Sequence, residues 1–164
     1  AGRARILIED ESHRIGRVTV PPMLFAAMRE APVVVIEELL DARVERIFDE
    51  YVSVQSGLFA AVYGAEVGFR AYADYLRRAL DAIRKRLGGD RHSSLTKALD
   101  AALVRHARDD MNGHRNWIRP LLEDYYDRMY AYQLELKASR IVYRGSFAAV
   151  RDYLRSEHFS STPE

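Results

Sequence analysis

The stretch from Arg5 to Arg17, RILIEDESHRIGR, constrains the fold of this chain more than any other. Ile6, Leu7 and Ile8 are consecutive aliphatic residues, a pattern typical of a parallel strand that helices cover on both faces. In open α/β sheets, ligands bind beyond the carboxyl ends of the strands. We therefore expect phosphate- or Mg²⁺-facing side chains just after this strand, at Glu9, Asp10, Ser12, Arg14 and Arg17. A strand followed by a solvated turn is the alternative interpretation.

A second apolar run completes a strand, helix, strand pattern. The segment after Pro21-Pro22 predicts a helix over 22–30, and residues 33–36 form a β-branched strand that again ends in acids. This is a βαβ unit. A parallel strand is not stable as a lone edge, and no element precedes the first strand. We therefore expect the chain to be the C-terminal part of a longer protein, cut within or beside an α/β domain.

Helical periodicity dominates the rest of the sequence. It predicts helices over 39–52, 69–87, from a cap at Ser93 or Ser94 to 106, 114–136 and 147–155, with a break at 109–113 and a short strand at 139–144. The predicted fold class is α/β, with a partial P-loop-type βαβ unit followed by a mostly α-helical C-terminal region. The predicted domain ranges are 1–56, 57–158 and a flexible tail over 159–164.

Composition excludes several function classes. The 164 residues include no cysteine, which excludes disulfides, thiolate metal sites and a cysteine nucleophile within this chain and fits a reducing cytoplasm. No apolar run approaches the roughly 20 residues that cross a bilayer, so no membrane partner is expected. Formal net charge is only +1, and nothing global demands nucleic acid.

The basic side chains are nevertheless concentrated around one helix end. We define the basic ridge as Arg77, Arg78, Arg84, Lys85, Arg86 and Arg91. Positions seven residues apart share a side of a helix, so such a ridge is suited to tracking phosphates. The alternative is a solvated surface with ion pairs between neighbouring turns.

A tyrosine cluster is the second candidate contact surface. Four tyrosines fall within eight residues, followed by Gln133: Tyr125, Tyr126, Tyr130 and Tyr132. They cannot all share one helical face, and exposed tyrosines near arginine are suited to stacking on unpaired bases. The alternative is a core-facing helix whose hydroxyl groups reach polar partners.

No complete catalytic apparatus is present in the sequence. It contains no G-x-x-x-x-G-K-[ST] phosphate loop and no G-x-S-x-G motif. His106, Asp110 and His114 are spaced by four, but Gly113 interrupts the helix that a metal site on them would need. We assign no catalytic residue and no metal ligand there. Glu9 and Asp10 are suited to holding Mg²⁺ directly or through water.

Several ordered blocks resemble the tRNA 2-selenouridine synthase family. They are IEDESHRIGRVTVPPMLFAAMREAPVV, RVERIFDEY from Arg43, KRLGG from Lys85, Trp117-Ile118 and YYDRMYAYQ, and together they span Ile6 to Leu154. The chain departs from the family pattern at His13, where a basic residue is more usual, and at Arg128, where the family typically has Pro.

The resemblance implies a larger enzyme with an N-terminal rhodanese-like domain that bears a catalytic cysteine, followed by a P-loop domain. Such enzymes replace the sulfur of 2-thiouridine at the tRNA wobble position with selenium from selenophosphate, through an S-geranylated intermediate formed with geranyl diphosphate. This chain would be inactive alone, because it holds neither the cysteine nor the P-loop.

The resemblance also implies roles for individual residues. Glu9 and Asp10 would match the acids that face the P-loop, and Ser12, Arg14 and Arg17 the turn beside a diphosphate or selenophosphate. Arg43 and Arg86 would contact phosphate or the tRNA backbone, while Tyr125, Tyr126, Tyr130 and Gln133 would face tRNA or another domain. The residues alone leave two alternatives open. The chain is part of a P-loop small-molecule kinase, or it is a non-enzymatic helical module that binds protein.

Overall fold

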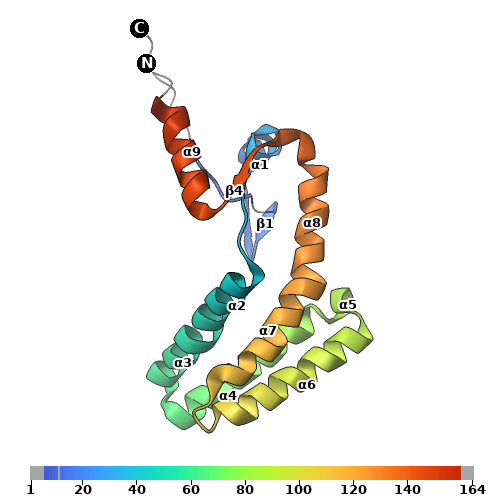
Figure 1. The fold of residues 1–164 in the computed structure, drawn as a ribbon. Helices are drawn as coiled ribbons and strands as arrows, with labels where there is room; N and C mark the ends of the chain where they lie inside the picture. The colour runs from blue at the N-terminus through green and yellow to red at the C-terminus, as the bar shows by residue number, and fades with distance from the viewer. Residues whose placement is uncertain (1–5, 11, 160–164) are drawn as a thin grey trace. The chain divides into compact units, whose positions relative to one another are not determined.

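The computed structural model describes residues 6–10 and 12–159 and divides the chain into two compact units (Figure 1). Unit 1 is Ala1–Glu37 with Leu134–Glu164, and unit 2 is Glu38–Gln133. Unit 2 is therefore inserted between the two sequence segments of unit 1. The predicted domain ranges 1–56 and 57–158 group residues differently and stay a prediction. Residues 160–164 of the predicted tail lie outside the described residues.

Unit 1 contains the strands. The antiparallel pair is β1 (Arg14–Ile15) with β2 (Val18–Thr19), and the parallel pair is β3 (Val33–Ile36) with β4 (Ile141–Gly145). The other elements are α1 (Pro22–Glu30), the 3-10 turn η4 (Ala138–Arg140) and α9 (Phe147–Phe159). Arg140 donates to the carbonyl oxygens of Met28 and Ala31, which holds η4 against the end of α1. The predicted helix at 22–30 and strand at 33–36 are confirmed.

The predicted strand at the start of the chain is wrong. Residues 6–10 form no strand, and Ile6 and Leu7 are 82% and 71% exposed. No strand in the described part of the chain pairs with this segment, so its backbone has no ladder of hydrogen bonds to join. The parallel partner of β3 is β4, from the predicted strand at 139–144. The mixed α/β, mostly helical class is confirmed.

Unit 2 is helical, and two of its long helical stretches contain wider π-helical turns. Its elements are α2 (Leu40–Phe48), η1 (Asp49–Val54, π), α3 (Gln55–Tyr63), α4 (Ala65–Ala82), α5 (Arg84–Leu87), α6 (Gly89–His106), η2 (Met111–His114, 3-10), α7 (Arg115–Leu121), η3 (Leu122–Tyr126, π) and most of α8 (Asp127–Leu136). Helices α4, α6 and α7 lie side by side (Figure 1). Among the described residues, no helix is long and apolar enough to cross a membrane.

The core of unit 2 joins helices α2, α4, α6 and α7. Tyr72, Leu99 and Ile118, from α4, α6 and α7, are the largest apolar side chains in it with essentially no exposure. Gly68 allows α3 and α4 to approach closely, because a Cβ there would lie 2.5 Å from the carbonyl oxygen of Phe59. This packing fixes the helices that carry the candidate site.

Two helix starts differ from the predicted ones, for one physical reason. Helix α4 begins at Ala65 rather than 69, and α6 begins at Gly89 rather than after Ser93 or Ser94. The residues before them, Gly64 and Gly88, have φ of 79° and 82°. Glycine alone adopts this backbone region readily, so the chain reverses at the glycine and the next helix starts at once.

Candidate functional site

The predicted phosphate-facing residues of unit 1 lie on an exposed segment. These residues are Glu9, Asp10, Ser12, Arg14 and Arg17. Asp10 forms an ion pair with Lys137, and the Ser12 hydroxyl donates to the carbonyl oxygen of Arg14 at 2.7 Å. No group of three His, Asp or Glu side chains among the described residues is arranged to hold a metal ion. Their phosphate and Mg²⁺ contacts therefore stay predictions.

The β1–β2 hairpin around these residues was not predicted. Its turn is Gly16-Arg17, between the paired residues Ile15 and Val18, and Gly16 has φ of 60°. A two-residue loop with glycine between β-branched residues is a recognised hairpin pattern. The hairpin places Arg14 in β1 and Arg17 in the turn, and both residues are exposed.

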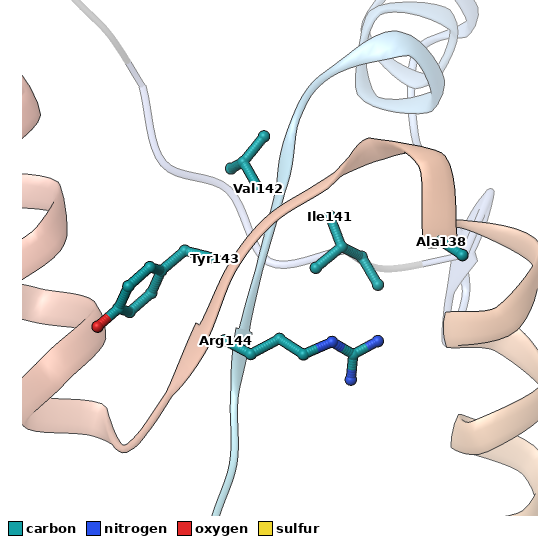
Figure 2. Close-up of a pocket in the computed structure, with 5 residues that line it drawn as sticks. All are labelled: Ala138, Ile141, Val142, Tyr143 and Arg144. Atoms are coloured by element: carbon teal, nitrogen blue, oxygen red, sulfur yellow. The ribbon is translucent and has the colours of Figure 1, made fainter.

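A shallow cavity of about 440 Å³ lies along β4 in the same unit (Figure 2). Ala138 and the four residues from Ile141 to Arg144 line it. The ring of Tyr143 stacks on that of Tyr153 in α9 with centroids 4.3 Å apart, and Arg144 pairs with Glu37 at 3.6 Å. These contacts tie β4 to α9 and to the end of β3, so the lining has a structural role.

Arg43 belongs to unit 2 and is already paired there. Its guanidinium makes a two-pronged ion pair with Asp127, one arm at 2.8 Å, and joins α2 to the start of α8. The hydrogen bond to Asp127 raises the pKa of Arg43, and the same bond lowers the pKa of Asp127. The predicted phosphate contact of Arg43 therefore requires this pair to open.

The basic ridge divides into a paired half and an unpaired half. Arg77 binds Asp100 at 2.9 Å, and Arg78 donates to the carbonyl oxygen of Asp74. The other members are exposed and have no acidic partner among the residues that the structure describes: Arg84, Lys85, Arg86 and Arg91. This second half, on α5 and the first turn of α6, therefore presents cationic groups that make no hydrogen bond or ion pair with the described residues.

The tyrosine cluster is likewise divided between core and surface. Tyr125 packs edge-on against Tyr126 at 4.9 Å, and both contact the core of unit 2. Tyr126 stacks on Tyr130, which is 55% exposed. Gln133 is exposed as well. Burial raises the pKa of the Tyr126 phenol, while the charge of Arg86 acts to lower it. Arg86, from the unpaired half of the ridge, therefore lies close enough to Tyr126 for its charge to act on the phenol, and both belong to unit 2.

A row of buried hydrogen bonds in unit 2 was not predicted from the sequence. The indole N–H of Trp117 donates to Nδ1 of His114 at 2.9 Å, and Nε2 of His114 lies 3.1 Å from Nδ1 of His106. Because an indole only donates, the proton of neutral His114 must be on Nε2, and His106 accepts it. Of the residues spaced by four, His106 and His114 are thus hydrogen-bonded to each other.

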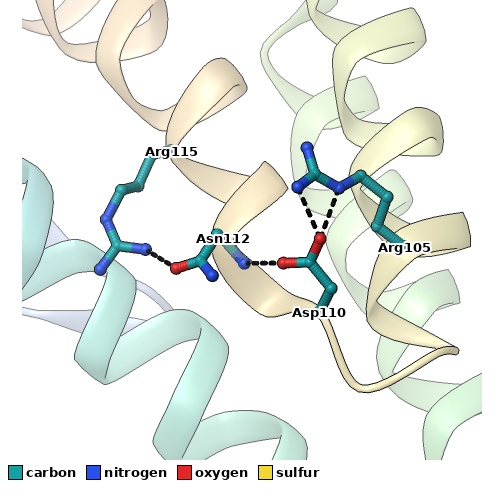
Figure 3. A network of polar contacts seen from close by, with 4 residues as sticks. All are labelled: Arg105, Asp110, Asn112 and Arg115. Atoms are coloured by element: carbon teal, nitrogen blue, oxygen red, sulfur yellow. Dashed lines mark hydrogen bonds and ion pairs between the residues drawn. The ribbon is translucent and has the colours of Figure 1, made fainter.

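A second polar network fixes the turn between α6 and α7 (Figure 3). The carboxylate of Asp110 accepts from Arg105 at 2.5 Å and from the backbone N–H of Asn112 at 3.1 Å. The Asn112 side chain in turn accepts from Arg115. The bond from Arg105 lowers the pKa of Asp110. This turn, predicted as a break at 109–113, sets the packing of α6 against α7.

Comparison with known proteins identifies relatives of this chain. The family model described as the tRNA 2-selenouridine synthase AAA domain matches residues 1–161. The chain belongs to this family. The predicted resemblance, drawn from several short blocks, is thus confirmed over nearly the whole sequence.

Individual relatives agree with the family model. A tRNA 2-selenouridine synthase of Hahella chejuensis is 50% identical over 159 residues, which is 97% of this chain and 41% of that protein. The enzyme of the same name from Bordetella bronchiseptica is 47% identical over 94% of this chain and 42% of its own length. The chain spans about two fifths of the curated relatives that it matches. No solved structure matches it.

Proposed function

We propose that this chain supplies the tRNA-contacting part of a tRNA 2-selenouridine synthase, with unit 2 as the contact surface. One observation carries the proposal: unpaired cations of the basic ridge lie beside the start of the tyrosine cluster, with Arg86 close enough to Tyr126 for its charge to act on the phenol and Arg91 lining one groove with Asp124. Unpaired cations attract the phosphate backbone, and exposed aromatic rings stack on unpaired bases. Family membership favours tRNA modification over the small-molecule kinase alternative.

The activity proposed for the whole enzyme is replacement of sulfur by selenium in 2-thiouridine at the tRNA wobble position. Selenophosphate is the proposed selenium donor, and geranyl diphosphate forms the proposed S-geranylated intermediate. The catalytic cysteine and the P-loop come from the rhodanese-like and P-loop portions proposed to lie outside this chain. Glu9, Asp10, Ser12, Arg14 and Arg17 are proposed to face phosphate or Mg²⁺, and the cytoplasm is the proposed location.

The test is binding of the chain to a tRNA with a 2-thiolated wobble uridine, beside an unrelated RNA hairpin, at low and moderate salt. We expect binding that prefers the tRNA and weakens steeply with salt. The variant carries Arg84→Glu, Lys85→Glu and Arg86→Glu together. Removal of three phosphate contacts should reduce the slope of log affinity against log salt by about 2 to 3.

The matched control carries Arg70→Glu, Lys97→Glu and Arg108→Glu, which changes the charge of unit 2 equally but outside the ridge. Circular dichroism checks that both triple variants are folded. Equal loss of affinity in the two variants would show that only overall charge matters. Binding that no salt concentration affects, or that both triple variants retain, would instead favour the protein-binding module.

A further inference from the structure

A groove between α6 and α7 shares only Arg91 with the surface described above. Its volume is about 390 Å³, within the range of roughly 300 to 1,000 Å³ that is usual for small-molecule sites. Polar side chains from α6, α7 and the following turn η3 line its rim: Asp90, Arg91, Ser94, Asn116 and Asp124. The rim therefore offers donors and acceptors together.

The floor of the groove is apolar. Leu95, Ala98 and Pro120 line it, and Leu95 is only 6% exposed. These three side chains come from facing turns of the two helices and carry no hydrogen-bonding group. An apolar floor below a polar rim suits a flat ring that is polar only along its edges, as a nucleobase is.

Pro120 has a second consequence for the groove. It lies inside α7 and has no amide hydrogen, so the carbonyl oxygen of Asn116, four residues earlier, lacks its ordinary helical donor. Asn116 also presents its exposed carboxamide on the same rim. This one residue can therefore both donate and accept hydrogen bonds.

Asp124 follows at the next turn of the same face. Its ion pair with Arg128 is long, at 3.8 Å, and both side chains are half exposed or more. Such a pair contributes little and is easily displaced. The two oxygens of the Asp124 carboxylate can thus accept two adjacent N–H groups from a ligand.

We propose that the α6–α7 groove binds a guanine base. Guanine carries an imino N–H next to an exocyclic amino group, and a carboxylate accepts from both at once. Adenine and cytosine have the amino group without the imino N–H, and uracil has the imino N–H without the amino group. Asp124 reads this edge, Asn116 reads the adjoining carbonyl oxygen, and Arg91 faces the phosphate.

The guanine can come from an unpaired nucleotide of RNA or from a free guanine nucleotide. In the first case the inference deepens the proposed function and rests on it, because the groove then reads a base of the bound tRNA. In the second case it describes a separate ligand site in unit 2.

Calorimetric titration of the chain with GMP, IMP and AMP tests the proposal. We expect saturable binding of GMP, with an affinity about tenfold or more above those of IMP and AMP. IMP lacks the amino group, and AMP lacks the imino N–H. Asp124→Asn should weaken GMP binding by about tenfold to a hundredfold, since an amide cannot accept both N–H groups. The same variant should now prefer XMP, whose carbonyl oxygen accepts from the new amide N–H.

Asp74→Asn in α4 removes the same charge outside the groove and is the matched control, with circular dichroism as the check of folding. Equal GMP affinity in the Asp124→Asn and Asp74→Asn variants would overturn the proposal, as would a wild-type chain that fails to discriminate GMP from IMP and AMP. The gain of XMP binding separates base recognition from a fold defect, because an unfolded variant gains nothing.

Single-stranded RNA oligonucleotides distinguish the two sources of guanine. If RNA is the source, an oligonucleotide with one guanine binds tighter than GMP and tighter than its adenine counterpart; otherwise GMP is the tighter ligand. Discrimination of GMP without any tRNA binding would overturn the proposed function alone. Salt-dependent tRNA binding without guanine discrimination would overturn this inference alone.

Discussion

Unit 2 buries a core, whereas unit 1 buries little. All members of the main cluster of buried apolar side chains belong to unit 2. Among the described residues of unit 1, only Val20, Val35 and Val150 are buried apolar side chains. In the same unit, larger apolar side chains such as Met23 and Phe147 are 88% and 67% exposed.

The better-packed unit is therefore not the one that carries most of the predicted phosphate- and Mg²⁺-facing residues. Local stability follows the density of buried apolar contacts, so unit 2 should open far less often than unit 1. The residues predicted to face phosphate or Mg²⁺ lie in unit 1, apart from Arg43, and the proposed RNA and guanine contacts lie in unit 2. We expect the RNA-facing surface to be preorganised and the phosphate-facing segment to be more easily deformed.

Unit 2 should lose much of its stability in mild acid. His114 is fully buried in unit 2, and burial lowers its pKa to about 4 from an ordinary value of 6.5. Between these values the unfolded chain binds more protons, so folding stability is full above about pH 6.5 and falls as the pH drops toward 4. The total loss is about 3 kcal/mol.

Urea unfolding at pH 7, 6 and 5, monitored by the fluorescence of Trp117, measures this loss of stability in unit 2. Trp117 is the single tryptophan and donates to His114, so it reports on unit 2. The matched variant is His114→Gln, which should show a flatter pH dependence whatever its stability at pH 7. Identical pH dependence in the two proteins would show that His114 is not the responsible group.

Deleting the same atoms from each unit tests the comparison directly. Val52 and Val150 are 0% and 4% exposed, in unit 2 and unit 1. Val52→Ala should cost about 2 kcal/mol, because the surrounding core cannot close the cavity, whereas Val150→Ala should cost less in a sparsely packed unit. Thermal unfolding with hydrogen exchange assigns each loss to its unit. Equal losses would mean that unit 1 is as tightly packed as unit 2.

A glycine pair tests how unit 2 reverses its chain. Gly88 has φ of 82° and Gly89 has no positive φ, and neither has an atom within 4 Å of the position of an added Cβ. Gly88→Ala should destabilise by about 1 to 2 kcal/mol through backbone strain alone. Gly89→Ala should instead be neutral or slightly stabilising. Denaturant midpoints of the two variants measured side by side check the opposite signs.

These glycines also show where sequence reasoning reached its limit. Helical spacing predicted most elements, because one apolar face per helix is visible in the order of residues. Ser93 or Ser94 was predicted as the start of α6, because serine is a favoured cap, but the backbone reverses earlier, at Gly88. A glycine that ends one helix and starts the next has the same sequence pattern as one that only ends a helix.

The strand at residues 6–9 was mispredicted for a different reason. Composition shows that Ile6, Leu7 and Ile8 suit a strand, but a strand also needs a neighbour, and pairing is not visible in local sequence. The features of the candidate site likewise fall into those visible in local sequence and those that depend on contacts between distant residues. The ridge and the tyrosines were found from their spacing, whereas the Arg43 pair with Asp127 and the groove between α6 and α7 depend on residues far apart in sequence.

Exposed ion pairs should contribute little to the stability of either unit. Arg144 pairs with Glu37 in unit 1, Arg70 pairs with Glu66 in unit 2, and all four side chains are at least 44% exposed. Arg144→Gln and Arg70→Gln should each change the free energy of unfolding by less than about 1 kcal/mol, because such pairs are solvated and screened by salt. Denaturant unfolding in 0.05 and about 0.5 M salt provides the check. Similar small effects in both units would leave apolar burial as the cause of their different stabilities, whereas a loss well above 1 kcal/mol confined to Arg144→Gln would mean that unit 1 depends on its charges instead.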